Sequence, residues 1–186
     1  MQIRDPVSRF ISRYRFNREI LPKMKDRTLL REARNRSENI NQCVLDGHIE
    51  CDYTGTLDRW HKQFQMDSQI PFLCGDSEIC RTMGHPEAVE ATIRNIDNNY
   101  LVVGVLEMLE ETVTVLECLM PDVMQGLVEA FRTSEVHKKS HHAAMAAAVM
   151  REEVRDVMRE RLEPEYSVYQ YVRQRLARQY TQCLTK

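Results

Sequence analysis

The sequence predicts an α/β domain in which helices outnumber strands. Two segments have the character of strands: residues 2–4 and the continuous, β-branched apolar run at residues 101–105. Five or six other segments carry helical periodicity or residues that begin helices. Two strands make an underpopulated sheet, so we expect residues 1–186 to form a single, partial domain that lacks part of its sheet and is rich in helices toward its C-terminus.

The first helix is expected to begin at Pro6 and to end before Pro22. Asp5 is a suitable N-cap, and proline fits the first helical position because its missing N–H is not needed there. Its apolar face recurs at helical spacing: Val7, Phe10, Ile11 and Tyr14. Ser8, Ser12 and Arg15 lie elsewhere on its surface.

Further helices follow along the chain. A basic stretch at residues 23–36 is expected to be a loop and a short helix, and residues 39–85 to be irregular, with Trp60 and residues 70–73 as anchors. Pro86 begins a helix that runs to about residue 97, capped by His85 or Gly84. The last helices are expected at residues 107–119, 121–131, 143–161 and 164–180.

Composition limits the class of protein. With 42% hydrophobic and 29% charged residues the chain is typical of soluble domains, and it has no apolar run long enough to cross a bilayer. The net charge of −2 is divided unevenly: residues 1–36 carry +7, residues 37–131 carry −13 and residues 132–186 carry +4. Basic ends indicate that an anion is bound there, although solvated helix faces give the same pattern.

Six cysteines indicate an oxidising compartment. The pairs Cys43–Cys51 and Cys74–Cys80 bracket turn-forming residues, so each is interpreted as a local disulfide. Neither pair has the spacing of a zinc site, and no metal is expected. Cys118 lies in an apolar helical run and is expected to be a buried free thiol; Cys183 is not assigned.

Arg4, Asp5-Pro6 and Ser12 form a candidate phosphate site. A strand that ends in an arginine and leads into a helix with an exposed hydroxyl can bring a guanidinium, backbone N–H groups and that hydroxyl to one anion. The same residues also fit a helix-capping Arg-Asp-Pro turn that binds nothing.

The sequence resembles a known family at these residues. Residues 4–12 resemble the motif R-[DN]-P-x-x-R-x-x-S, with which sulfotransferases bind the 3′-phosphate of the donor 3′-phosphoadenosine 5′-phosphosulfate. The segments around both cysteine pairs and at residues 100–110 are similar to the glycosaminoglycan 2-O-sulfotransferases, which include the uronyl and heparan sulfate enzymes and the insect Pipe proteins. The similarity covers nearly the whole chain.

The resemblance implies a P-loop-like sulfotransferase fold with a parallel sheet. It also implies a reaction. The reaction is sulfo transfer from this nucleotide donor to the 2-hydroxyl of a hexuronic acid in heparan, dermatan or chondroitin sulfate. Arg4 and Ser12, with Arg9 in support, would bind the donor, and Lys23, Lys25 and Arg27 would contact the acidic polysaccharide.

The resemblance also implies a cellular setting: a Golgi-lumenal, type II membrane protein whose anchor lies outside these residues. It further implies a homotrimer, and it implies neither a metal nor a nucleic-acid partner. The sequon at Asn35 is consistent with glycosylation in the lumen.

Departures from the family pattern bear on activity. Relatives carry, upstream of the Arg-Asp-Pro strand, a loop for the 5′-phosphosulfate and a histidine base, and we expect both to lie outside this sequence with the N-terminal strands. The alternative is a non-catalytic lumenal protein that binds nucleotide or polysaccharide.

Two further departures lie near the expected nucleotide site. Arg13 stands where many relatives have an aromatic residue, and an alanine-rich segment at residues 143–148 replaces a basic one. Three nearby histidines are interpreted as a solvated helix start: His137, His141 and His142.

Overall fold

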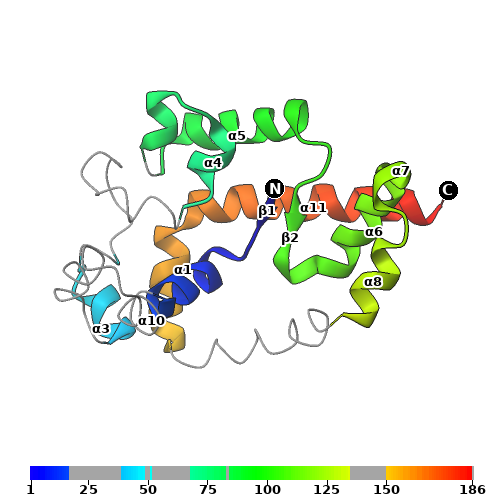
Figure 1. Ribbon diagram of the computed structural model, residues 1–186. Coiled ribbons are helices and arrows are strands. Elements are labelled where there is room, and N and C mark those ends of the chain that lie inside the picture. Colours follow the sequence, from blue (N-terminus) through cyan, green and yellow to red (C-terminus); the bar gives the residue numbers. More distant parts are fainter. Residues whose placement is uncertain (17–38, 49–50, 52–67, 83, 135–149, 186) are drawn as a thin grey trace, which may run out of the picture.

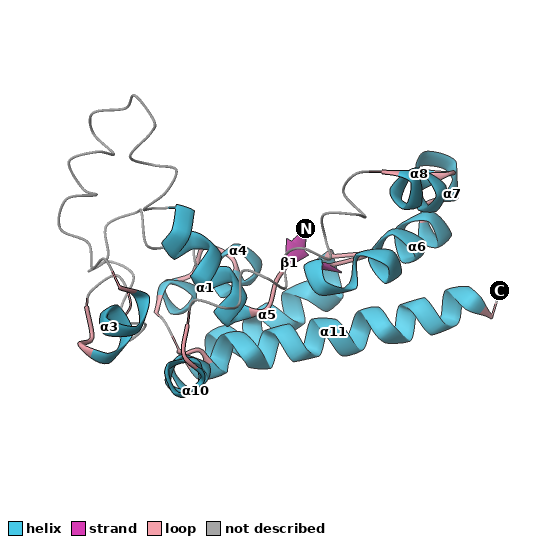
Figure 2. Ribbon diagram, turned by 90° about the horizontal axis from the view of Figure 1, so that it is seen from below, coloured by secondary structure: helices cyan, strands magenta, loops and turns pink. Residues whose placement is uncertain are grey.

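One long helix organises the computed structural model (Figure 1). The structure describes residues 1–16, 39–48, 51, 68–82, 84–134 and 150–185. The long helix is α11 (Glu163–Leu184), and α5 (Pro86–Asn99) and α6 (Leu109–Leu119) pack against it. Seen from below, α11 runs along one side of the molecule, and α10 (Glu152–Arg161) meets its N-terminal end (Figure 2).

A two-stranded parallel sheet lies at the centre, which confirms the expected parallel pairing. β1 (Gln2–Ile3) pairs with β2 (Gly104–Val105), with Gln2 opposite Gly104 and Ile3 opposite Val105. A Cβ atom at Gly104 would lie 2.6 Å from Cγ2 of Thr112, so only glycine lets α6 pack this closely on the strand.

The second strand is shorter than predicted. The expected strand at residues 101–105 contains only Gly104–Val105, and Leu101 is exposed. The carbonyl oxygens of Tyr100 and Leu101 accept hydrogen bonds from Arg175 Nη2 at 2.7 Å and Gln179 Nε2 at 2.9 Å. Because α11 satisfies these carbonyl groups, this part of the apolar run needs no neighbouring strand.

Two hydrophobic cores lie side by side. The first joins β1, β2, α4 (Ile70–Cys74), α5, α6 and α11, and includes Ile3, Leu73, Ile96, Val105, Val115 and Leu176. The second joins α1 (Pro6–Arg15), α3 (Ile40–Leu45) and α10, and includes Val7, Phe10, Ile11, Val44 and Met158. Tyr166 of α11 packs against both, so the start of α11 connects them.

Several helices differ from the expected pattern. Residues 39–85 are not wholly irregular, because they contain α3, α4 and the 3-10 turn η4 (Glu78–Arg81); a second such turn, η5 (Leu106–Met108), precedes α6. The helix predicted at residues 121–131 is divided into α7 (Pro121–Met124) and α8 (Leu127–Thr133). The break lies at Gly126, whose φ of 81° is left-handed, and Glu117 accepts the N–H groups of Gly126 and Val128 there.

Three disulfides link the described cysteines. Cys43–Cys51 and Cys74–Cys80 are both present, as expected. The prediction for Cys118 was wrong, because it is not a free thiol but pairs with Cys183, with Cα atoms 6.0 Å apart. The packing of α6 against α11 brings these two residues together, which no local sequence pattern reveals. Among the described residues, no helix is both long and apolar enough to span a membrane.

Candidate functional site

The start of α1 places Arg4 at the end of the sheet. β1 ends at Ile3, and Asp5 then caps the helix: its Oδ1 accepts the N–H of Ser8 at 2.8 Å, and Pro6 occupies the first turn. This strand, turn and helix follow the expected pattern. They leave Arg4 between the sheet and the helix.

An open cavity of about 370 Å³ lies beside this turn. Its walls combine apolar surface with polar and basic groups, from Gln2, Ile3, Arg4, Arg9, Ser12, Arg13, Phe16 and Leu106. No carboxylate is among the described residues that line it. Three guanidinium groups therefore face one space, and this arrangement favours a multiply charged anion.

Arg4 is partly buried, with 20% of its side chain exposed. Its Nε is buried and has no hydrogen-bond partner among the described residues. The nearest carboxylate oxygen, Oε1 of Glu107, lies 3.8 Å from Nε, which is too far for a hydrogen bond. Arg4 also lines the cavity, so its guanidinium can donate hydrogen bonds to an anion there.

Ser12 and Arg9 line the same cavity as Arg4. Ser12 is exposed, one helical turn beyond Ser8, and its hydroxyl has no hydrogen-bond partner among the described residues. Arg9 is half-buried, and its positive charge acts to lower the pKa of Glu165, against the larger effect of burial, which raises it. The structure thus brings the three candidate donor-binding residues to one site.

Arg13 supplies the third guanidinium group at the cavity. Its guanidinium lies 5.7 Å from the centre of the Phe16 ring, which also lines the cavity. Sequence reasoning noted Arg13 only as a departure from relatives. Its position four residues after Arg9 was the signal that could have placed both on one helix face.

A carboxylate behind the cavity ties these elements together. Glu107 follows β2; its Oε1 accepts the N–H of Asp5 at 3.1 Å, and its Oε2 accepts the Tyr169 hydroxyl at 3.1 Å. Tyr166 donates to Oδ2 of Asp5 at 2.9 Å, and burial together with this carboxylate raises the pKa of Tyr166 to about 12. The turn that carries Arg4 is therefore fixed from β2 and from α11. The sequence alone gave Glu107 no such role.

Other candidate residues lie outside the described part of the chain. These are Lys23, Lys25 and Arg27 for the polysaccharide, Asn35 for glycosylation, and the histidines His137, His141 and His142. Within the described part, no group of three or more His, Cys, Asp or Glu side chains could hold a metal ion.

Comparison with known proteins agrees with the strand, turn and helix that carry Arg4. A family model described as "Sulfotransferase family" matches residues 1–172. The chain belongs to this family. It is 32% identical to uronyl 2-sulfotransferase of Mus musculus over 178 residues, which cover 92% of the chain and 41% of that protein.

Heparan sulfate 2-O-sulfotransferases are also similar to this chain. The Homo sapiens protein is 32% identical over 142 residues, which cover 75% of the chain and 35% of that protein. The resemblance to uronyl and heparan sulfate 2-O-sulfotransferases is thereby confirmed. The chain spans less than half the length of these relatives.

Proposed function

We propose that the cavity beside α1 binds the 3′-phosphate of the sulfo donor 3′-phosphoadenosine 5′-phosphosulfate. The observation that carries the proposal is the convergence of Arg4, Arg9, Arg13 and Ser12 on one cavity whose described lining contains no carboxylate. A phosphate monoester carries up to two negative charges and accepts several hydrogen bonds, which guanidinium and hydroxyl groups donate.

The proposed roles follow from the positions of these groups. Arg4 lines the cavity, where its guanidinium would donate hydrogen bonds to phosphate oxygens. Ser12 offers its hydroxyl from the exposed surface of α1. Arg9 and Arg13, one helical turn apart, supply charge on either side of Ser12.

The proposed reaction transfers the sulfo group to the 2-hydroxyl of a hexuronic acid in a glycosaminoglycan. The acceptor hydroxyl gives its proton to a base, its oxygen forms a bond to sulfur, the bond from sulfur to the phosphate oxygen breaks, and adenosine 3′,5′-bisphosphate leaves. Uronyl 2-sulfotransferase and heparan sulfate 2-O-sulfotransferase support this acceptor class by their names and their similarity to the chain. The proposed site of action is the Golgi lumen, and three disulfides are consistent with such an oxidising compartment.

Calorimetry with two nucleotides tests the donor site. Adenosine 3′,5′-bisphosphate and adenosine 5′-monophosphate differ by the 3′-phosphate alone, so the ratio of their affinities measures what that group contributes. We expect the wild type to prefer the bisphosphate. We expect Arg4→Ala to lower bisphosphate affinity about 10- to 100-fold, the range for loss of a charged hydrogen bond.

Arg94→Ala is the matched control, because Arg94 is an exposed arginine on α5 whose one ion-pair partner among the described residues is Glu90. It should leave both affinities unchanged. Equal affinities of wild type and Arg4→Ala for the bisphosphate would remove Arg4 from the site.

For these 186 residues on their own we expect negligible transfer of labelled sulfate to desulfated heparin or dermatan; rapid transfer would contradict that expectation.

A further inference from the structure

The backbone of Arg4 is held by a side chain distant in the sequence. Oε1 of Gln69 accepts the N–H of Arg4 at 2.7 Å, and Nε2 of Gln69 donates to the carbonyl oxygen of Arg4 at 2.9 Å. Gln69 is 4% exposed. One side-chain amide thus satisfies both backbone groups of Arg4, as a neighbouring strand would do just beyond the end of β1.

Gln69 is in turn fixed by a buried carboxylate. Glu165, at the start of α11, is 5% exposed. Its Oε2 accepts the N–H of Gln69 at 2.9 Å, and its Oε1 accepts the N–H of Ile70 at 3.2 Å and the hydroxyl of Ser68. These three donors lie at the start of α4, where helix N–H groups lack partners within the helix. The carboxylate therefore anchors the segment that presents the Gln69 amide.

We propose that Gln69 is a positioning residue for the nucleotide 3′-phosphate, acting through the backbone of Arg4, and that Glu165 holds Gln69 in place. The inference rests on the proposed donor site. Arg4 lies between two fixed points, the pairing of Ile3 with Val105 and the N–H of Asp5 on Glu107. The Gln69 amide fixes the peptide groups between these points. It therefore also fixes the direction in which the Arg4 side chain extends from the main chain.

The orientation of the Arg4 guanidinium decides how well it can bind phosphate. A guanidinium binds phosphate oxygens through hydrogen bonds with strict geometry, so a small backbone shift at Arg4 weakens those bonds. Loss of the Gln69 amide would leave the main-chain N–H and carbonyl of the partly buried Arg4 without these hydrogen bonds. The main chain would then shift so that both groups find other partners. The effect should therefore appear in recognition of the 3′-phosphate, beyond any general loss of stability.

The test is the affinity ratio of adenosine 3′,5′-bisphosphate to adenosine 5′-monophosphate in Gln69→Met. Methionine has about the volume of glutamine but neither donates nor accepts the two bonds. We expect the ratio to fall at least about fivefold, a loss of roughly 1 kcal/mol in 3′-phosphate recognition. Gln69→Glu keeps an acceptor for the Arg4 N–H and loses the donor to its carbonyl, so its ratio should fall as well.

Asn95→Leu is the matched control. Asn95 Nδ2 donates to the carbonyl oxygen of Leu73 at 2.6 Å, so this change removes a side-chain bond to the backbone at the opposite end of α4, away from Arg4. It should lower the melting temperature and leave the ratio unchanged.

The outcomes separate the two proposals. If Gln69→Met has the same affinity ratio for the two nucleotides as the wild type, Gln69 has no positioning role, while the proposed donor site still stands. If Gln69→Met does not fold, an affinity ratio in Gln69→Glu equal to that of the wild type overturns the positioning role in the same way. A wild type that binds the two nucleotides with equal affinity refutes the donor site itself.

Discussion

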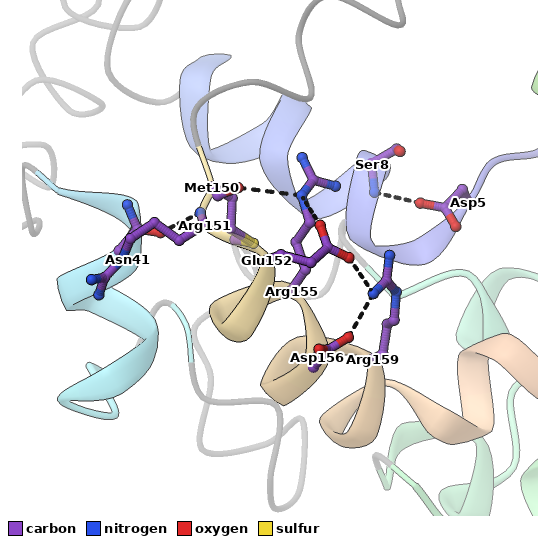
Figure 3. Close-up of polar contacts among 9 residues, drawn as sticks. All are labelled: Asp5, Ser8, Asn41, Met150, Arg151, Glu152, Arg155, Asp156 and Arg159. Carbon is purple, nitrogen blue, oxygen red and sulfur yellow. Dashed lines mark hydrogen bonds and ion pairs between the residues drawn. The ribbon is translucent and has the colours of Figure 1, made fainter.

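Two groups of arginines on neighbouring helices differ in what surrounds them. On α10, Arg159 bonds to Glu152 at 2.7 Å and to Asp156 at 2.6 Å, and these bonds raise its pKa (Figure 3). Arg155 lies 3.7 Å from Glu152, and Arg151 lies 3.3 Å from the carboxylate of Glu153. Around the cavity beside α1, by contrast, the described lining contains arginines and no carboxylate.

We infer that this difference separates arginines that stabilise a helix from the arginines of the proposed donor site. Both helices are rich in arginine, so the number of arginines does not distinguish them. The sequence of α10 places acidic residues next to its arginines, whereas residues 6–15 of α1 contain none. A carboxylate neutralises the charge that an incoming anion would need. The carboxylate nearest to Arg4 is that of Glu107, which lies 3.8 Å from Arg4 Nε and outside the cavity lining, so basic groups outnumber acidic ones at the site.

Adding a carboxylate to the cavity tests the difference between the two groups of arginines most directly. Ser12→Asp removes the hydroxyl and puts a negative charge among Arg4, Arg9 and Arg13. We expect bisphosphate affinity to fall about 100-fold, because a like charge at the site and a lost hydrogen bond act together. Thermal stability should hold or rise, as an ion pair replaces clustered positive charge. Calorimetry and thermal unfolding measure the two effects.

Ser8→Asp is the control for this change. It makes the same substitution one turn earlier on α1, outside the cavity lining, near a helix N-terminus where a carboxylate is favourable. Its nucleotide affinity should stay within about threefold of wild type. An equal loss in both variants would mean that α1 acts through its overall charge and has no localised site.

Arg13 allows a finer distinction within the cavity. Its guanidinium lies over Phe16 at the cavity wall. We expect Arg13→Ala to weaken bisphosphate binding about three- to tenfold. The loss should be smaller than in Arg4→Ala, because Gln69 holds the main chain of Arg4 in place, whereas Arg13 lies outside the family motif. Arg13→Tyr, which restores the aromatic type found in many relatives, should behave in the same way. Unchanged affinity in both variants would limit the site to the residues of the family motif.

Local sequence patterns predicted α1, because a cap, a proline and a helical spacing all act within a few turns. The resemblance to the sulfotransferase motif is what singled out Arg4, Arg9 and Ser12, and the structure places all three at one cavity. Local patterns could not predict the partners that come from elsewhere in the chain. Gln69 bonds to Arg4 across 65 residues, and Cys118 joins Cys183 across the same separation.

Side-chain partners were missed for the same reason. Glu110 accepts a hydrogen bond from Arg132 Nη2 of α8 at 2.7 Å, a contact between two helices that the sequence did not predict. Each such contact depends on how two helices pack together. Helical periodicity in a sequence predicts which face of a helix is buried, but not which residues that face contacts.

The smallest expected effect concerns the paired arginines. Glu152→Gln removes an exposed carboxylate that pairs with both Arg155 and Arg159. We expect the free energy of unfolding to fall by only about 0.5–1 kcal/mol, because water around Glu152 screens the attraction and ordering the side chains costs entropy. Nucleotide affinity should not change, since these arginines do not line the cavity. Urea unfolding at low and high salt measures the loss, which should shrink as salt screens the wild-type pairs.

Glu160→Gln supplies the reference for that measurement. Glu160 is an exposed acidic residue of the same helix that forms no ion pair with the described residues, so this change alters net charge alone. If Glu152→Gln instead strengthened nucleotide binding while Glu160→Gln did not, the freed α10 arginines would be reaching the ligand. The distinction between the two arginine groups would then depend on their carboxylate partners rather than on their position, because removing one carboxylate would have turned a stabilising arginine into a binding one.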